Sequence, residues 1–447
     1  MSRLRHLLAG AALLPLLAAC GPDPIDPQTQ VGPNPPLPAL HQYLLPPMHV
    51  SRSVGWKDGE TPQVAAGLQV KALATGLKSP RSLLVLPNGD ILVAESGGPT
   101  PPINRPKEII MGWLEGLSHP PEKPGQRITL LRDADGDGVA ELRTVLLDTL
   151  NAPFGMALVG DDLYVANTDA VMRYPYKPGT TQITEPGTKL TELPAGRINH
   201  HWTKSLTASP DGTKLYAGVG SNSNVTENGI DEETDRASIW EIDRVTGAHR
   251  LYATGLRNPN GLTFEPRTKV LWCVVNERDE LGPDLVPDYM TSVKDGGFYG
   301  WPYSYWGRNL DPRVMPQRPE LVAQAIMPDY SLSSHVAPLG MAFATGTGLP
   351  QSYRSGAFVA EHGSWNRDPL NGYKVVYIPF ENGKPVGKAR DVVTGFVNAD
   401  NQARGRPVGL AIDAQGSLLI ADDAGGTVWR VTGSGARSEA GPAAIIR

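Results

Sequence analysis

The feature that most constrains the fold is a pattern that recurs six times along the chain. Each copy begins with proline or threonine, continues with a small residue and ends in alternating apolar positions. The copies occupy residues 80–85, 153–158, 203–208, 259–264, 338–343 and 407–412, and the third is the weakest. A turn and a second apolar run follow each copy, at 89–95, 162–167, 214–219, 270–275, 356–361 and 417–422. Turns such as Pro87-Asn88-Gly89 between two such runs are typical of β-hairpins.

Six strand pairs at a long period predict an all-β protein, a six-bladed β-propeller with one four-stranded blade for each repeat. A large β-sandwich or a series of stacked β-domains is the alternative. Forty-nine glycines and 42 prolines agree with many turns and short strands. We expect the propeller to cover residues 67–435, with residues 70–73 closing the ring and 436–447 as a C-terminal tail. Long loops at 101–127, 279–317 and 362–373 should form a ligand pocket on one face.

The N-terminus has the pattern of an exported lipoprotein. Arg3 and Arg5 precede an apolar stretch, residues 7–19, which is too short to span a bilayer. The sequence Leu17-Ala18-Ala19-Cys20 resembles a bacterial lipobox and predicts a signal peptide at 1–20 with lipidation of Cys20; an ordinary secretory signal is the alternative. We therefore expect a protein anchored by lipid in the bacterial cell envelope, facing the periplasm or the cell exterior. Residues 21–66 are predicted to be a proline-rich tether and lead-in.

Charge and cysteine content narrow the function further. A net charge of −5 gives no reason to expect a nucleic acid partner. Cys273 is the only cysteine besides Cys20, and its apolar surroundings predict a small buried side chain. The chain contains neither a Gly-x-Ser-x-Gly elbow nor a Gly-x-Gly-x-x-Gly nucleotide fingerprint.

Polar residues that suit catalysis cluster just before the repeated strands. His200 and His201 precede the third copy, where a neutral imidazole can act as a general base, although one packed and one solvated histidine is the alternative. Arg257 and Asn258 precede the fourth copy and should point at the mouth of the channel. Arg404 and Arg406 hold the matching place before the sixth copy. Arginines that converge on one axis are costly without anions, which favours a polyanionic cofactor over structural ion pairs.

Two acidic segments could bind a divalent cation. Residues 133–141 place carboxylates at alternate positions around glycines, as in a calcium loop, but an acidic hairpin turn explains the pattern equally well. Residues 277–284 form a charged loop for which a cation-binding and a solvated interpretation also have equal weight.

Together these segments resemble the sorbosone dehydrogenase branch of the soluble quinoprotein glucose dehydrogenase family. The resemblance covers about residues 68–431 and depends most on 201–212, 255–262, 275–282, 299–302 and 361–367. It implies a six-bladed propeller that binds pyrroloquinoline quinone (PQQ) and calcium.

The resemblance also assigns roles to individual residues. It implies that His201 is the catalytic base. Because neighbouring side chains at a strand entry point to opposite sides, we expect His200 and Trp202 to turn away from the channel. Arg257 and Asn258 match residues that hold the reactive quinone carbonyls.

Further residues match the family's cofactor contacts. Arg404 and Arg406 are similar to an arginine pair that meets the carboxylates of the cofactor. Arg367 or Lys374 would replace a cofactor-binding lysine of the family. The backbone carbonyls of Arg278 and Asp279 fall where the family binds calcium, although the glucose enzymes have Gly-Pro there.

The implied activity is oxidation of a sugar, polyol or sugar aldehyde, with hydride passing to PQQ and electrons then to an unidentified acceptor in the envelope. Two other classes stay open. One is a propeller that binds carbohydrate or a partner without a redox cofactor, and the other is a calcium-dependent hydrolase of the lactonase type.

Overall fold

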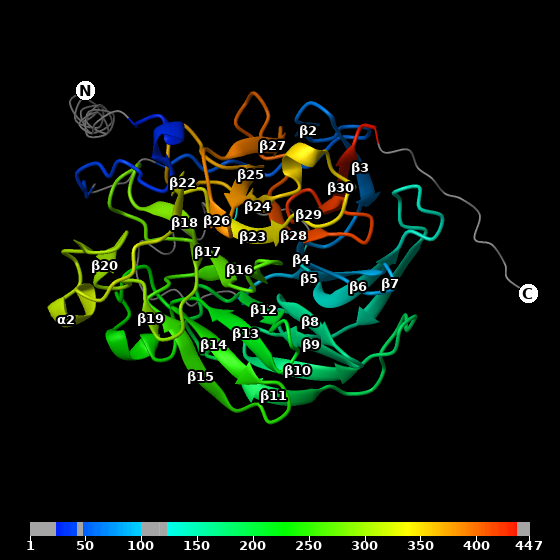
Figure 1. Ribbon diagram of the computed structural model, residues 1–447, viewed down its shortest axis with the longest axis horizontal. Helices are drawn as coiled ribbons and strands as arrows, with labels where there is room; N and C mark the ends of the chain where they lie inside the picture. The colour runs from blue at the N-terminus through cyan, green and yellow to red at the C-terminus, as the bar shows by residue number, and fades with distance from the viewer. Residues whose placement is uncertain (1–23, 43–47, 100–115, 117–122, 436–447) are drawn as a thin grey trace, which may run out of the picture.

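Six antiparallel sheets surround a central axis in the computed structural model of the protein (Figure 1). The structure describes residues 24–42, 48–99, 116 and 123–435. The prediction of a six-bladed, all-β propeller is confirmed.

The first three blades follow the chain in order from the innermost strand outward. The first blade contains β4 (Pro80–Val85), β5 (Ile91–Ser96), β6 (Gln126–Arg132) and β7 (Leu142–Leu147). The second contains β8 (Met156–Val159), β9 (Asp162–Ala166), β10 (Ala170–Pro175) and β11 (Thr188–Glu192). The third contains β12 (Lys204–Ala208), β13 (Lys214–Val219), β14 (Ser238–Asp243) and β15 (His249–Thr254), and β19 (Gly297–Phe298) joins its edge.

The other three blades complete the ring and accept strands from elsewhere in the chain. The fourth blade contains β16 (Pro259–Phe264), β17 (Leu271–Val275), β18 (Pro287–Ser292), β22 (Tyr330–Ser334) and β1 (Val31–Gly32). The fifth contains β23 (Pro338–Phe343), β24 (Gly356–Glu361), β25 (Lys374–Glu381), β27 (Arg390–Thr394) and β2 (Gln63–Val64), and β26 (Lys384–Pro385) pairs with β25. The sixth contains β28 (Pro407–Ile412), β29 (Leu418–Asp422), β30 (Thr427–Gly433) and β3 (Leu68–Ala74).

The ring is closed by pairing its first strand with its last blade. Strand β3 runs antiparallel to β30, with Val70 opposite Val431. This confirms the prediction that residues 70–73 close the propeller.

The remaining elements of the described chain are short. They are the hairpin β20 (Ser304–Tyr305) and β21 (Asn309–Leu310), the helix α2 (Pro319–Val322) and the 3₁₀ turns η1 (Pro27–Gln30), η2 (Ile230–Glu233) and η3 (Gln351–Tyr353). None of the helices in the described ranges has the length and apolar character needed to cross a membrane.

The six repeated segments form the wall of the central channel. Their strands β4, β8, β12, β16, β23 and β28 contact one another in a closed ring and lie around the centre of Figure 1. A narrow cavity of about 80 Å³ lies between them. The strands approach so closely that glycine is needed: a Cβ on Gly340 would lie 2.0 Å from Val408 O, and one on Gly155 would lie 2.2 Å from Leu206 N. The glycine of the repeat is thus explained by contact with the next blade.

Apolar residues pack between the faces of neighbouring blades. One cluster joins Leu92 and Ile128 of the first blade to Leu163 and Val165 of the second, all of them fully buried. Cys273 is likewise a buried free thiol in the fourth blade, as predicted.

The N-terminal lead-in differs from the prediction of an extended tether. Strand β1 pairs with β22, and buried Gln30 donates from Nε2 to Asp284 O at 2.8 Å. His41 N donates to Leu281 O at 3.0 Å, and His49 N donates to Trp365 O at 2.9 Å. The described part of 21–66 is therefore docked on the propeller, because backbone pairing and buried hydrogen bonds replace the apolar periodicity that it lacks. The predicted signal peptide, Cys20 and the tail 436–447 lie outside the described residues.

Candidate active site

Two adjoining cavities occupy one end of the central channel. The outer cavity has a volume of about 420 Å³ and the inner one about 150 Å³. Both are lined by His201, Arg257, Asp279 and Trp365. Their lining residues come mainly from segments just before the inner strands or just after the second strands. Because the inner strands of a propeller run side by side, these segments meet at the same end of the channel.

His201 lies directly before β12 and is fixed by the backbone of the third blade. Its Nδ1 lies 2.7 Å from Ser221 O and 3.0 Å from Ser221 Oγ, which itself donates to Ser223 O. A carbonyl only accepts hydrogen bonds, so Nδ1 carries the proton and Nε2 is left as the basic nitrogen. Burial and the nearby Arg257 hold the pKa of His201 well below its usual 6.5. The imidazole is therefore neutral at physiological pH and suited to accept a proton.

Arg257 and Asn258 lie just before β16, the inner strand of the fourth blade. Arg257 lines both cavities, and Asn258 lines the inner one. The Arg257 guanidinium donates to Glu277 O at 2.7 Å, to Asn224 Oδ1 at 3.0 Å and more weakly to Asp279 Oδ2 at 3.5 Å. Asn258 is buried and lines the inner cavity. Its Oδ1 has no hydrogen-bond partner among the described residues. A buried polar atom without a partner indicates a site that a ligand completes.

Asp279 is the carboxylate at the junction of the two cavities. Its Oδ1 accepts from Asn366 Nδ2 at 2.7 Å and lies 3.4 Å from His335 Nδ1. Burial would raise the pKa of Asp279, but His335 and Arg257 outweigh it and lower the pKa to about 2. His335 donates from Nε2 to Gly282 O at 3.0 Å, and Asp279 raises its pKa despite burial. Asp279 is therefore ionised at neutral pH, and its charge favours the protonated form of His335.

Asp288 lies behind this pair on the wall of the inner cavity. Its two oxygens accept from the backbone amides of Glu277 and Ala337, at 2.7 and 2.8 Å. Burial raises the pKa of Asp288 to about 7. A second, readily protonated carboxyl thus stands close to the ionised one.

Arg406 lines neither cavity itself but belongs to a polar cluster that includes Gly363, a residue of the inner cavity wall. Its guanidinium donates to the carbonyls of His362 and Gly363, at 3.3 and 3.2 Å, and stacks on the Tyr373 ring at 5.1 Å. Asp423 accepts hydrogen bonds from Arg81 and lies 3.1 Å from His362 Nε2. Burial and Arg406 lower the pKa of His362 to about 4. The cluster thus combines two arginines, Asp423 and a neutral histidine, and the Asp422 carboxylate accepts from the Arg406 amide at 2.7 Å.

Two of the predicted cofactor residues, Arg404 and Arg367, lie away from the cavities. Arg404 turns to Glu60, with Nε 3.5 Å from Oε2, and lines neither cavity. Arg367 is fully buried and donates to Ile25 O at 2.7 Å and Asp284 Oδ1 at 2.9 Å, so it holds the N-terminal segment. The structure gives both arginines structural partners in place of the cofactor contacts that we expected.

Of the two backbone carbonyls predicted to bind calcium, that of Asp279 has hydrogen-bond partners in the structure. The Arg278 side chain is fully buried, bound to Glu277, Asp311 and the carbonyls of Pro302 and Ser304. The Asp279 carbonyl accepts from Arg313 Nη1 at 2.9 Å and from Asn224 Nδ2 at 3.2 Å. The Asp279 carboxylate, and not its carbonyl, is the group that the arrangement presents to a cation.

His200 and Trp202 line the outer cavity together with His201, in contrast to the expected turn away from it. Strand β12 begins only at Lys204, so the alternation of a strand does not apply to residues 200–202. His200 is exposed and borders the outer cavity alone, whereas His201 borders both.

Several residues of the site gave little or no signal in the sequence. Lys204 is fully buried beneath the histidine pair, with Nζ 3.4 Å from the carbonyls of His201 and Trp202. Burial holds its pKa well below 10.5. Ser221 and Asp288 stand after or within ordinary strands. Of these three residues only Lys204 could have been found from the sequence, because a charged residue stands there at an apolar position of the repeat.

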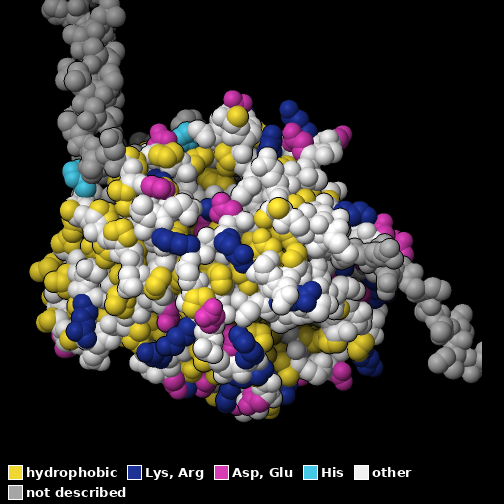
Figure 2. Space-filling model, turned by 45° about the horizontal axis from the view of Figure 1, so that its top comes forward, with side chains coloured by type: hydrophobic (Ala, Val, Ile, Leu, Met, Phe, Trp, Pro, Cys, Tyr) yellow, Lys and Arg dark blue, Asp and Glu magenta, His cyan; other side chains and the backbone are white. Residues whose placement is uncertain are grey.

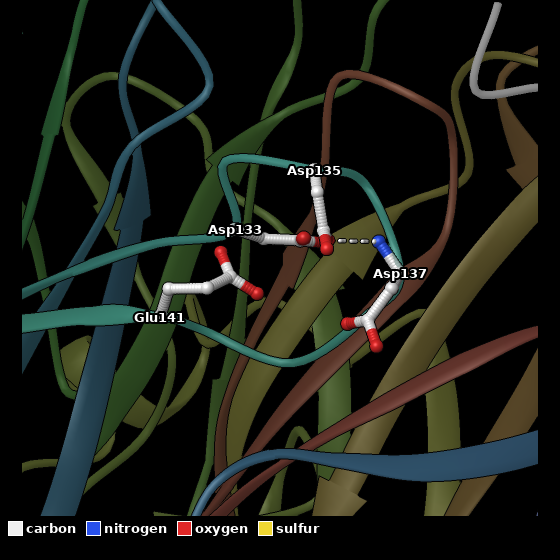
Figure 3. A group of neighbouring side chains, drawn as sticks. All are labelled: Asp133, Asp135, Asp137 and Glu141. Carbon is white, nitrogen blue, oxygen red and sulfur yellow. Dashed lines mark hydrogen bonds between the residues drawn. The ribbon is translucent and has the colours of Figure 1, made fainter.

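The acidic loop at 133–141 connects β6 to β7 and lines neither cavity. Figure 3 shows its four acidic side chains. Carboxylate oxygens of Asp133, Asp135, Asp137 and Glu141 lie within 4.8 Å of one another. Asp133 also pairs with Arg430 Nη1 at 2.8 Å, and Asp137 with Lys71 Nζ at 3.1 Å. Calcium loop and acidic turn both remain compatible with this geometry.

The fold and the cavities define a six-bladed propeller with a polar site at one end of its channel, where histidines and Arg257 meet several carboxylates. Comparison with known families then assigns the chain: residues 122–290 and 321–434 match the TrAA12-like family, and the protein belongs to it. This confirms the resemblance to the quinoprotein sugar dehydrogenases.

Two proteins similar to this chain come from fungi. The PQQ-dependent pyranose dehydrogenase of Coprinopsis cinerea is 26% identical over 430 residues, which cover 82% of this chain and 54% of the relative. The chain thus spans about half the length of that relative. A PQQ-dependent sugar dehydrogenase of Hypocrea jecorina is 22% identical and covers 82% of this chain and 88% of its own. The structure of the PQQ domain of the Coprinopsis enzyme in its holo form superposes with a TM-score of 0.67 at 22% identity, over 86% of this chain and all of that domain.

Proposed function

We propose that the protein is a PQQ-dependent dehydrogenase that oxidises a sugar, a polyol or a sugar aldehyde, with calcium in the same site. The relatives named above support a quinoprotein oxidoreductase. The observation that carries the proposal is His201, a neutral base held through Nδ1 beside the Arg257 guanidinium in a cavity of about 420 Å³. Cavities of this size hold small-molecule ligands.

The residues present fit an anionic quinone. Arg257 and the side-chain NH2 of the adjacent Asn258 are donors that can meet a carbonyl oxygen, whereas the unpartnered Asn258 Oδ1 can accept a hydrogen bond or bind a cation. Arg406 is held by carbonyls and a tyrosine ring, so its charge is available to a ligand carboxylate. In this proposal Arg257 and Asn258 would hold the quinone carbonyls, and Arg406 would meet a carboxylate.

Calcium prefers several oxygen ligands, and the inner cavity provides them. The Asp279 carboxylate and the Asn258 side-chain oxygen both line it, with Asp288 on the same wall. We therefore assign the cation to these side chains, in place of the two backbone carbonyls first expected.

PQQ, when bound, would accept a hydride from the substrate, and with it the two electrons of the oxidation. His201 Nε2 would remove the proton of the substrate hydroxyl, and Ser221 would keep the ring in the required tautomer. The Arg257 cation would stabilise negative charge that develops on a neighbouring oxygen. Trp202 and Trp365 border the space in which the substrate would lie.

Reconstitution of the purified protein with PQQ and calcium tests this function. Addition of a pyranose sugar should change the cofactor's absorption spectrum from that of the quinone to that of the quinol. The Arg257→Met variant is the control that should bind PQQ weakly. A wild-type protein that binds no PQQ, or binds it and reduces it with none of a panel of sugars, polyols and aldehydes, would contradict the proposal.

Cellular location forms a second part of the proposal. We infer that Cys20 carries the lipid anchor and that reduced cofactor passes its electrons to an acceptor in the envelope. A Cys20→Ser variant should lose its acyl chains, and mass spectrometry of the N-terminal peptide measures this directly. An unmodified Cys20 in the wild-type protein would refute the anchor and leave the dehydrogenase proposal intact.

A further inference from the structure

One flank of the propeller exposes apolar side chains on the insertion between β19 and β22. Leu310, Met315 and Met327 are 52%, 76% and 57% exposed. Hydrophobic side chains gather on the left flank of Figure 2, the side that carries β20 and α2 in Figure 1. Exposed apolar patches of this kind mark surfaces that bind a partner or a membrane.

The insertion is a built structure, since its parts are held together by specific contacts. Met327 lies against Gly307 in the turn of the β20–β21 hairpin. Gln317 Nε2 donates to the carbonyls of Asp311 and Val314, both at 2.7 Å, which holds the segment carrying Met315 against the hairpin. The three apolar side chains are therefore presented by one folded unit.

The N-terminus of the described chain is fixed close to this insertion. Ile25 donates from its amide to Asp284 Oδ2 at 3.0 Å and accepts from Arg367 Nη2 at 2.7 Å. Leu285 and Val286, next to Asp284, share an apolar cluster with Tyr305 and Trp306 at the base of the hairpin. Leu37 of the N-terminal segment packs on the same cluster.

The length of chain before Ile25 decides which partner this flank can meet. Cys20 precedes Ile25 by five residues, which span at most about 17 Å when fully extended. A lipid on Cys20 would therefore hold the insertion near the bilayer. Arg308 is exposed beside Leu310, and a cation there favours anionic lipid headgroups.

We propose that the flank formed by Leu310, Met315 and Met327 docks on the lipid surface and fixes the orientation of the propeller on the membrane. This inference rests on the proposed lipid anchor at Cys20. A second copy of this chain is the other partner that could cover this patch. The experiment distinguishes the lipid surface from a second copy.

The test places a fluorescent label on the lipidated protein in vesicles of phosphatidylethanolamine and phosphatidylglycerol with brominated acyl chains. A Met315→Cys variant carries the label, and Val245→Cys is the matched control, because Val245 is similarly exposed (69%) in the turn between β14 and β15. Cys273 is fully buried and Cys20 would be acylated, so neither competes for the label. Brominated lipids should quench the label at position 315 at least threefold more strongly than at position 245.

Mass spectrometry of the same sample first establishes whether Cys20 is acylated, which separates failure of the anchor from failure of the docking surface. Equal quenching at the two positions in acylated protein would overturn the proposal. A label at position 315 that is shielded in detergent without lipid, together with a dimer in sedimentation, would assign the flank to a second copy and also overturn it. A Leu310→Glu, Met315→Glu and Met327→Glu triple variant that is still acylated, labelled through an added Pro312→Cys substitution at an exposed position between Leu310 and Met315, should show no selective quenching.

Discussion

Replacing His201 by asparagine removes the proposed base and keeps the hydrogen bond that positions it. The asparagine amide can still donate to Ser221 O, which His201 Nδ1 approaches at 2.7 Å, but it offers no basic nitrogen in place of Nε2. General-base catalysis contributes about 10²–10⁴-fold, equivalent to about 2.7–5.5 kcal/mol of activation free energy. We therefore expect His201→Asn to lose turnover by that factor while its free energy of unfolding and its affinity for PQQ stay near those of the wild type.

Alanine at the same position gives a contrasting result. His201→Ala should lose turnover to the same extent, and it should also lose about 1–3 kcal/mol of stability because Ser221 O is left without its donor. Single-turnover reduction of bound PQQ measures the chemical step, and denaturant unfolding measures stability. His200→Asn is the control, since His200 is exposed and borders the outer cavity alone; it should stay within about threefold of the wild-type rate, a change of less than 1 kcal/mol.

The pH dependence supplies an independent check. The base acts in its neutral form, and burial with Arg257 holds the pKa of His201 well below 6.5. The rate should therefore remain on its plateau as the pH falls through 6.5 and decline only at lower pH. An His201→Asn variant within tenfold of the wild-type rate, or a wild-type acid limb centred above pH 6.5, would refute the assignment of His201 as the base.

Three further predictions concern the cofactor, the fold and a buried acid. Arg406→Ala should weaken PQQ binding about ten- to a hundredfold, which is the value of one charge-assisted hydrogen bond. Arg404→Ala loses only its contact with Glu60 and should leave PQQ affinity unchanged. Equal losses of affinity for the two variants in a PQQ titration would contradict this distinction. Gly340→Ala should destabilise the propeller by at least about 1–3 kcal/mol, because the new Cβ would lie 2.0 Å from Val408 O. Gly435→Ala is the control, since Gly435 has open space around it and its replacement should leave thermal unfolding unchanged. An unaffected Gly340→Ala protein would disprove the close packing of β23 on β28. Burial raises the pKa of Glu361 from 4.5 to about 8, so the folded state prefers the protonated form and the free energy of unfolding should fall as the pH rises from about 4.5 to 8. Glu361→Gln should remove that decline and Glu381→Gln, an exposed control on β25, should keep it; identical pH profiles of the wild type and Glu361→Gln would show that Glu361 does not titrate in this range.

Local sequence was sufficient to predict the architecture. Each copy of the repeat contains its own turn, its own alternation and the small residue that the neighbouring blade requires, so the six inner strands could be placed from short-range patterns. The closing strand was also predictable, since a ring of four-stranded blades needs one strand from the other end of the chain.

The candidate site residues were predictable only where they flank an inner strand. His201, Arg257, Asn258 and Arg406 precede strands whose ends meet at one mouth, so their positions along the chain place them near the axis. The direction of a long side chain does not follow from such a position. Arg404 pairs with Glu60, and Arg367 pairs with Asp284. A guanidinium lies several bonds from its backbone, so its partner is whichever anion or carbonyl the tertiary structure brings near.

The sequence alone therefore determined the number of blades, the closure of the ring and the segments that border the channel, because each depends on periodic patterns within a few tens of residues. Tertiary structure decided the rest. The Asp279, His335 and Asn366 cluster joins three separate loops, and the N-terminal segment binds the fourth blade through Gln30 and Ile25. Contacts between residues distant in the chain have no local periodicity to predict them, and their pKa values follow from burial and charges that exist only once the blades have packed.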